Sequence, residues 1–281
     1  WDDSAKVPYL YDPNNEKFIS YDDKASIAEK LNYLKTNGLA GAMLWELAGD
    51  IRNVDDPESL VNYIYNGLNS PNLILDTSQS LSSGDLWSFD AIVGNAGAGT
   101  FTQSGGTHTI TYDLILGQET GSNGAYSLAN DGVLYTTNTF VGYAGRGTFT
   151  QTGGVHFANE SLILAANPGS TGAYNLSGGS LTVPTIILNV GGAFSQTGGS
   201  LTFTTFNQTG GTATLPDLYV GRNPGTTETY NLSGGTLATN NTYVGYYGTG
   251  IFNQSGGAQT VSQTLSLGDQ PGGTGTYNLS G

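Results

Sequence analysis

The sequence predicts a mainly β protein: a parallel β-helix of about nine turns, preceded by an incomplete α/β segment. Composition changes at about residue 70, because residues 1–70 hold all five lysines and 18 of the 30 charged residues but only four of the 43 glycines. Residues 71–281 repeat a short aromatic phrase nine times, mostly at steps of 22–25 residues. A repeat of this period is typical of solenoids. We therefore expect two structural units, residues 1–70 and residues 71–281.

The first helix is predicted over residues 22–38. Asp22 or Asp23 can cap its first amides, and Gly38 is placed to end it. Its apolar side chains recur at helical spacing and would form one buried face, made of Ile27, Leu31 and Leu34.

A buried strand and a second helix are expected next. Residues 39–47 are almost continuously apolar and too short for another helix, which favours a strand buried on both faces. The second helix is predicted from Pro57 to about Leu68, with Asp56 as its cap. Helix, strand and helix are typical of α/β architecture with parallel strands. One strand and two helices cannot enclose a core, so this unit is incomplete.

Three blocks of this segment carry a family resemblance. They are W-D-D-S-A-K-V-P-Y-L-Y at 1–11, F-I-S-Y-D-D at 18–23 and G-L-A-G-A-M-L-W-E-L-A-G-D at 38–50. Together they resemble the C-terminal end of family 18 glycoside hydrolases, the bacterial chitinases. In that family a (β/α)₈ barrel ends in a strand with a G-G-x-M-x-W-E pattern, whose first glycine is Ala40 here. The resemblance implies that residues 1–70 are the C-terminal fragment of such a barrel.

The resemblance also implies a sugar-binding role for Trp45. It corresponds to the tryptophan on the last barrel strand that floors the −1 sugar subsite, and an indole face suits a pyranose. The alternative is that Trp45 is a core residue, and Glu46 would pair within the scaffold. The family's acid motif, D-x-x-D-x-D-x-E, does not occur in residues 1–281. We therefore expect no catalytic residue in this chain and no activity from it alone, although its parent protein would be a chitinase-like hydrolase.

Two pairs of adjacent carboxylates lie at the starts of the two predicted helices. They are Asp22-Asp23 and Asp55-Asp56. Negative charge is favourable at a helix N-terminus, so capping explains both pairs without catalysis.

The repeat alternates two aromatic phrases. One is F-x-Q-[ST]-G-G and the other is Y-N-L-S-G-G, with apolar Val-Gly or Leu-Gly phrases between most of them. Glycine pairs supply positive-φ corners, and stacking would place the aromatic rings in one ladder with rungs ~4.8 Å apart. Phe149 should then contact Tyr126 and Tyr174. The step from Phe194 to Phe206 is short and lacks a Val-Gly strand, which predicts a short or irregular turn near residues 194–217.

Residues that could carry chemistry are few in the repeat. His108 and His156 are predicted to be ordinary surface histidines two turns apart, too far from each other to share a metal. We expect no metal site and no cofactor. Outward Asn, Thr, Ser and Tyr side chains could form a flat sugar-binding face, but a solvated solenoid surface is the favoured interpretation.

Charge and hydropathy exclude two classes of partner. The net charge is −14, and no lysine follows residue 70, so the chain has no electrostatic means to bind nucleic acid or anionic lipid. No apolar run approaches the ~20 residues of a membrane span. Cysteine is absent, which excludes a disulfide frame and a thiolate metal site.

The repeat resembles those of secreted bacterial surface proteins, including autotransporter passenger regions, which implies an extracellular or cell-surface location. Because the chain starts at Trp1 and stops within a repeat, we expect a fragment. The first hypothesis is the C-terminal part of a secreted chitinase-like hydrolase with an appended β-helix stalk or adhesion region. Its partner would be chitin or a related glycan, with cell-surface or glycan contact through the β-helix. The second is a non-catalytic surface adhesin with a vestigial barrel segment.

Overall fold

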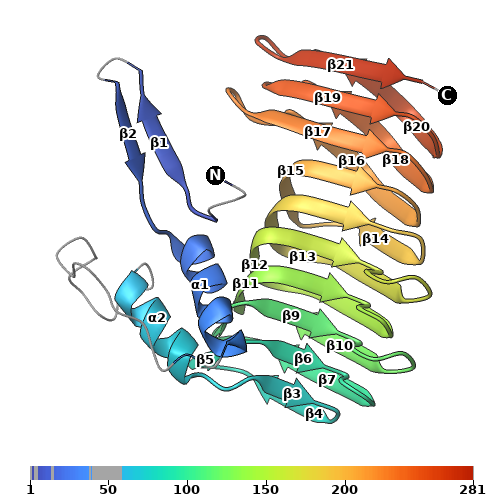
Figure 1. The fold of residues 1–281 in the computed structure, drawn as a ribbon. Coiled ribbons are helices and arrows are strands. Elements are labelled where there is room, and N and C mark those ends of the chain that lie inside the picture. Colours follow the sequence, from blue (N-terminus) through green and yellow to red (C-terminus); the bar gives the residue numbers. More distant parts are fainter. Residues whose placement is uncertain (1, 3–5, 14–15, 38, 40–58, 281) are drawn as a thin grey trace.

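The computed structural model describes residues 2, 6–13, 16–37, 39 and 59–280. Most of this chain is a parallel β-solenoid of about nine turns, and two helices lie against its first turns (Figure 1). A short antiparallel hairpin precedes the helices. Among the described residues, no helix combines the length and apolarity that crossing a membrane requires.

The elements follow one another along the chain with few long connections. The N-terminal part holds the hairpin and both helices: β1 (Tyr9–Asp12), β2 (Lys17–Ser20), α1 (Lys24–Thr36) and α2 (Leu60–Asn69). The solenoid is built from β3 (Leu73–Leu75), β4 (Ser78–Leu81), β5 (Asp85–Ser88), β6 (Ala91–Val93), β7 (Ala98–Gln103), β8 (Thr107–Ile110), β9 (Asp113–Leu116), β10 (Asn123–Leu128), β11 (Val133–Val141), β12 (Arg146–Leu164), β13 (Thr171–Leu188), β14 (Gly192–Gln196), β15 (Ser200–Gln208), β16 (Thr212–Val220), β17 (Thr227–Leu232), β18 (Thr236–Val244), β19 (Thr249–Gln254), β20 (Ala258–Leu267) and β21 (Thr274–Leu279).

Strand pairing in the solenoid is parallel, as the repeat predicts. Phe149 is in register with Tyr126 of the turn before and with Tyr174 of the turn after. The ring centroids are 5.1 Å and 4.6 Å apart, with nearly parallel planes. Alternate side chains along each strand point into the coil, so each turn with an aromatic phrase adds a ring to a shared interior. The prediction of a parallel β-helix is confirmed.

The aromatic rings form two ladders rather than the one predicted. The first runs from Phe101 to Phe194 and the second from Phe206 to Tyr277. At the junction Phe194 and Phe206 meet edge to face, with centroids 5.9 Å apart and planes at 88°. Phe206 is in register with Ile186, not with Phe194.

The short step therefore shifts the repeat around the coil. Phe194 is in register with Ala213, only 19 residues further along the chain, whereas 23 residues separate Tyr126 from Phe149 in a regular turn. The turn that contains the short step is therefore shorter than the regular turns, and the predicted short or irregular turn near residues 194–217 is confirmed in its length. The aromatic phrase also moves to another side of the coil, because the omitted Val-Gly phrase shifts the phase of the sequence relative to the turns.

The alternation of the two phrases has a hydrogen-bonding cause. Tyr174 donates its hydroxyl to Oε1 of Gln151 in the turn before, at 2.7 Å, and both side chains are fully buried. The Gln151 amide in turn donates to the carbonyl oxygens of Gly154 and Ser180. The same Tyr–Gln pair recurs for Tyr126 with Gln103, Tyr230 with Gln208, and Tyr277 with Gln254. Each F-x-Q turn thus supplies the acceptor that the next tyrosine needs, as buried polar groups require partners.

Two predictions about the helices are corrected or refined. Asp23 caps α1, as expected. By contrast, α2 begins at Leu60, later than predicted, and Ser59 is its N-cap, accepting from the Asn62 amide. A serine satisfies an orphan helix amide about as well as an aspartate does. Asp56 and Pro57, like the predicted strand after Leu39, lie outside the described residues.

Candidate functional site

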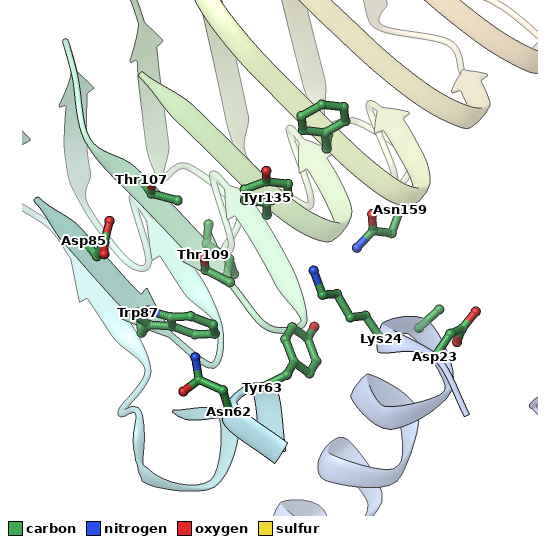
Figure 2. A pocket seen from close by; sticks show the side chains of 13 residues that line it. Asp23, Lys24, Asn62, Tyr63, Asp85, Trp87, Thr107, Thr109, Tyr135 and Asn159 are labelled. Carbon is green, nitrogen blue, oxygen red and sulfur yellow. The ribbon is translucent and has the colours of Figure 1, made fainter. Parts of the chain in front are cut away.

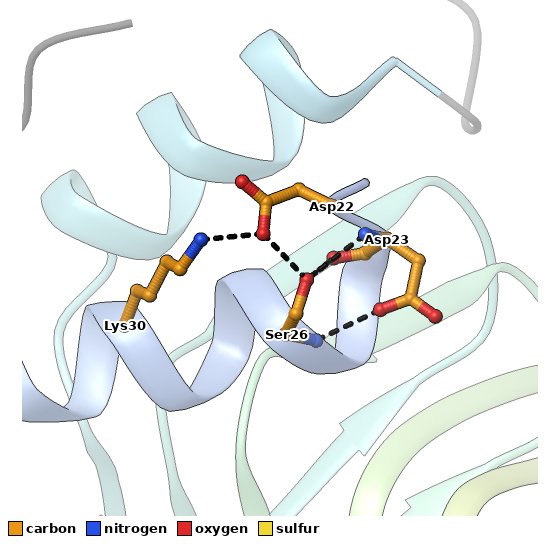
Figure 3. Close-up of polar contacts among 4 residues, drawn as sticks. All are labelled: Asp22, Asp23, Ser26 and Lys30. Atoms are coloured by element: carbon orange, nitrogen blue, oxygen red, sulfur yellow. Dashed lines mark hydrogen bonds and ion pairs between the residues drawn. The ribbon is translucent and has the colours of Figure 1, made fainter. Parts of the chain in front are cut away.

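The start of α1 is held by a reciprocal cap (Figure 3). The Asp23 carboxylate accepts from the Ser26 amide, and the Asp23 amide donates to the Ser26 hydroxyl, each at 2.9 Å. Asp22 accepts from the same hydroxyl and pairs with Lys30. That ion pair is solvent-exposed and contributes little to stability. The prediction that this carboxylate pair is a capping device is confirmed.

The helices dock on the first solenoid turns through a small second core. Ile27, Leu31 and Ile64 pack with Phe89, which follows β5. The Lys35 ammonium lies 3.8 Å from the centre of the Phe89 ring. The buried Tyr63 hydroxyl donates to the Thr111 carbonyl oxygen at 2.8 Å. Burial raises the pKa of Tyr63 well above its ordinary value, so the hydroxyl remains a donor. This packing fixes α2 beside the sheet.

A groove of about 850 Å³ lies between the helices and the outer face of the solenoid (Figure 2). Trp87 of β5, Thr109 of β8 and Tyr135 of β11 occupy one column of that face, since Trp87 is in register with Thr109 and Thr109 with Tyr135. Phe157 of β12 continues the column and stacks on Tyr135 at 5.2 Å. Lys24 reaches toward the column from the start of α1, with its ammonium 5.9 Å from the centre of the Tyr135 ring.

The polar lining of this groove combines carboxylate, hydroxyl and amide side chains. Asp85 and Thr107 lie at one side of the column and Asn159 at the other, while Asn62 comes from α2. These side chains offer hydrogen-bond donors and acceptors around an aromatic column. Convergent polar groups beside apolar surface are the usual features of a small-molecule site. The groove depends on helix docking, so no pattern within the repeat alone predicts it.

In another outward column, asparagine side chains of successive turns hydrogen-bond to one another. The amides of Asn231, Asn253 and Asn278 each donate to the Oδ1 of the asparagine in the preceding turn, at 2.8 Å, beginning with Asn207. Side chains that pair along the coil in this way serve the stacking of turns. This column therefore favours the interpretation of a solvated solenoid surface.

His108 is buried, and the prediction that it is a surface residue is wrong. Its ring stacks on Phe101 with centroids 5.0 Å apart, its Nδ1 lies 3.1 Å from the Tyr126 hydroxyl, and its Nε2 lies 3.2 Å from the Ser88 hydroxyl. Because Tyr126 donates to Gln103, the network requires His108 Nδ1–H to donate and Nε2 to accept. Burial lowers the pKa of His108 to about 3, so the ring is neutral.

His156 repeats this arrangement two turns later, as its spacing predicts. It is fully buried, Nδ1 lies 3.0 Å from the Tyr174 hydroxyl, and Nε2 lies 3.2 Å from the Thr139 hydroxyl. Burial lowers its pKa to about 3 as well. Sequence reasoning placed both histidines outside because their partners belong to neighbouring turns. Among the described residues, no cluster of histidine and carboxylate side chains could hold a metal ion.

Carboxylates gather beside α1 at the start of β9. Burial, and then repulsion from Asp90, Glu160 and Glu29, raise the pKa of Asp113 to about 7. A hydrogen bond from the Asn138 amide to Asp113 Oδ1, 3.0 Å long, opposes this shift. Burial likewise raises the pKa of Asp90.

We expect Asp113→Asn to stabilise the protein at pH 8 by roughly 2 kcal/mol and to change its stability little at pH 4. The folded-state pKa of Asp113 lies above the ordinary 3.8. Its protonated form therefore favours the fold fully below pH 3.8, and this contribution is lost as the pH rises toward 7. An asparagine retains the acceptor for Asn138 and does not ionise. Thermal unfolding from pH 4 to pH 8 measures the difference, with the exposed Asp131→Asn as control. An equal effect at both ends of the range contradicts the prediction.

The remaining predicted site residues cannot be placed. Trp45, its neighbour Glu46 and the Asp55-Asp56 pair lie outside the described residues. The −1 subsite assignment of Trp45 therefore stays a prediction.

Comparison with known proteins concerns the N-terminal part of the chain. The model of glycosyl hydrolases family 18 matches residues 1–50. Chitinase A1 of Niallia circulans is 60% identical over 50 residues, which are 18% of this chain and 7% of that protein. Chitinase ChiA of Flavobacterium johnsoniae is 47% identical over 64 residues, 23% of this chain and 4% of that protein. Chitinase B of Serratia marcescens is 32% identical over 114 residues, 34% of this chain and 23% of that protein.

The chain thus spans less than a quarter of the length of these relatives. No solved structure matches it. The first 50 residues are similar to the family that the sequence blocks indicate, and a β-solenoid follows them.

Proposed function

We propose that this chain is part of a secreted chitinase-like glycoside hydrolase, in which residues 1–70 end the catalytic barrel and residues 71–281 form a β-helix stalk or adhesion region. The observation that carries the proposal is the match of residues 1–50 to family 18, with relatives named as chitinases. The substrate of the whole protein would be chitin or a related glycan.

The exposed hairpin supports a larger barrel. Leu10, Phe18 and Ile19 on β1 and β2 are at least half exposed in this chain. A two-stranded hairpin with uncovered apolar side chains is marginal in water, so further protein surface is its natural cover. The rest of the proposed hydrolase would supply it.

The acid motif decides between this enzyme and the second candidate, a non-catalytic surface adhesin. We expect the 281-residue chain to release no product from a fluorogenic chitooligosaccharide above the buffer rate, because D-x-x-D-x-D-x-E does not occur in it. The full-length parent protein should hydrolyse the same compound. Trp45→Ala in that protein should lower kcat/KM by about 10-fold or more, a loss of ~1.4 kcal/mol of transition-state binding.

A matched control is Tyr247→Ala in the same parent protein, which should leave hydrolysis unchanged because Tyr247 is an exposed aromatic residue of the solenoid outside the groove. Turnover by the purified 281-residue chain contradicts the assignment of the acid to the upstream barrel. A parent protein without the acid motif and without activity favours the adhesin. An unchanged kcat/KM for Trp45→Ala would contradict the sugar-binding role and favour the alternative that Trp45 is a core residue.

A further inference from the structure

One outward column of the solenoid is apolar over six successive turns. It lies on the sheet that contains β3, β6 and β9, and each member is in register with the next (Figure 1). The members of this isoleucine column are Ile74, Ile92, Ile115, Phe140, Ile163 and Ile187. With one residue at each strand spacing, the isoleucine column is ~24 Å long.

The isoleucine column is an uncovered surface. None of its side chains belongs to the solenoid core or to the small core under the helices. Ile74 is 54% exposed, and the other members are partly exposed. In the same turns, the outward residues of the aromatic phrases are polar, as in Thr102, Ser127 and Thr150. A continuous apolar stripe on an otherwise polar coil marks an interaction surface.

Charge narrows the kind of partner. The isoleucine column carries no charge, and it continues into the neutral column of Asn207, Asn231, Asn253 and Asn278. Asp90 and Asp113 each precede a member by two residues and so lie beside its first turns. The net charge of the chain is −14, so a second copy, an anionic lipid or a nucleic acid would be repelled. A neutral partner meets no such penalty.

The repeat of the isoleucine column selects among neutral surfaces. Its apolar groups recur at the strand spacing of ~4.8 Å. Further along the same face, the side-chain amides of Asn231 and Asn253 stack turn upon turn through hydrogen bonds of 2.8 Å. Amide groups that stack through N–H···O=C bonds share this period, whether they belong to peptides or to acetamido sugars. Each acetamide of chitin also carries a methyl group, so packed chitin chains present methyl groups at the spacing of the solenoid turns.

We infer that the isoleucine column binds the surface of packed chitin, with successive turns of the solenoid contacting successive polysaccharide chains. The contact removes the isoleucine side chains and the acetamide methyl groups from water, which is favourable. Each turn contributes a weak contact, and the contacts add up along the coil. The inference rests on the proposed function for the choice of glycan. It deepens that function by giving the β-helix a defined surface for insoluble substrate.

The test is a depletion assay of the 281-residue chain with powdered chitin and, separately, with microcrystalline cellulose, which has no acetamide. Retention on chitin is expected, with an affinity for cellulose at least about 10-fold weaker. An excess of soluble chitotetraose should not release the protein, because a single short chain meets only one turn. A variant with Ile115→Asn, Ile163→Asn and Ile187→Asn combined should lose at least about 10-fold in affinity for chitin.

The matched control is a variant with Thr102→Asn, Thr150→Asn and Ser195→Asn combined. These residues also face outward, at corresponding positions of three turns, but in the column that already contains Asn175. This variant should bind chitin like the wild type. Both variants should stay folded by circular dichroism, because asparagine occurs naturally in both columns.

Several results would overturn the inference. They are absence of retention on chitin, equal affinity for cellulose, and unchanged binding by the triple isoleucine variant. Release by chitotetraose, or loss of binding with Trp45→Ala, would instead place the sugar in the barrel remnant. A dimer in light scattering that the isoleucine variant abolishes would assign the face to a second copy. Hydrolysis of a soluble fluorogenic chitooligosaccharide by the parent protein is measured separately, so an active parent whose 281-residue part is not retained refutes this surface and leaves the proposed enzyme intact.

Discussion

Phe149→Ala is expected to destabilise the solenoid by roughly 3–5 kcal/mol, the usual cost of removing a fully buried aromatic ring. Phe149 has no exposed surface, stacks between Tyr126 and Tyr174, and also packs against His156 with centroids 5.0 Å apart. Removing it opens a cavity that touches three consecutive turns. Since each turn contacts only its neighbours, the loss should spread along the coil from this point.

Chemical denaturation monitored by circular dichroism measures this cost, and hydrogen exchange locates it. The amides of β10, β12 and β13 should exchange faster than those of β19 and β21. Phe140→Ala is the control, because Phe140 points outward from β11 and is only half-buried. Equal losses for the two variants would mean that the ladder does not dominate the stability of the coil.

The parallel pairing of the solenoid was predictable because the repeat encodes it directly. Residues at equal positions of successive phrases must stack if each phrase occupies one turn, and Tyr126, Phe149 and Tyr174 do so. The side of the coil that carries each phrase was not predictable from the period alone. Phe206 keeps its phrase but is in register with Ile186, because the sequence loses one Val-Gly phrase within a shorter turn.

The positions of the histidines and of the groove depend on contacts between turns or between units. His156 is buried because Tyr174 and Thr139, on separate turns, offer it hydrogen bonds. Within its own phrase, a histidine after Gly-Gly has no visible partner. The groove likewise exists only where α1 and α2 lie beside Trp87. The start of α2 shows a smaller ambiguity: Asp56 and Ser59 are both residue types that cap helices, the sequence pattern favoured Asp56, and the structure has Ser59 as the N-cap.

The missing phrase also explains an exception at Glu228. In a regular turn the Ala165 amide donates to the Val141 carbonyl oxygen of the preceding turn, at 3.0 Å. The corresponding amide is that of Gly221, and the turn before it contains the irregular step. The Glu228 carboxylate accepts from Gly221 instead, at 2.8 Å, and only 6% of Glu228 is exposed. Two residues before Tyr230, where most phrases have glycine, a glutamate therefore fills the space left by the absent phrase.

Where the Val-Gly phrase is present, that position has no room for a side chain, and Gly172→Ala is expected to destabilise the solenoid by about 3 kcal/mol or more. A Cβ on Gly172 would lie 1.8 Å from the Val141 carbonyl oxygen and 2.7 Å from the Ala165 amide nitrogen, both backbone atoms of the ladder. They cannot move without opening the hydrogen bond between them. Gly169→Ala in the same turn is the control, because Gly169 has a positive φ of 86° but no atom within 4 Å of its added Cβ. It should cost only ~1–2 kcal/mol from the left-handed backbone. Denaturation of both variants separates the two effects, and a cost for Gly172→Ala no greater than that for Gly169→Ala would show that the turns stack less closely than this ladder requires.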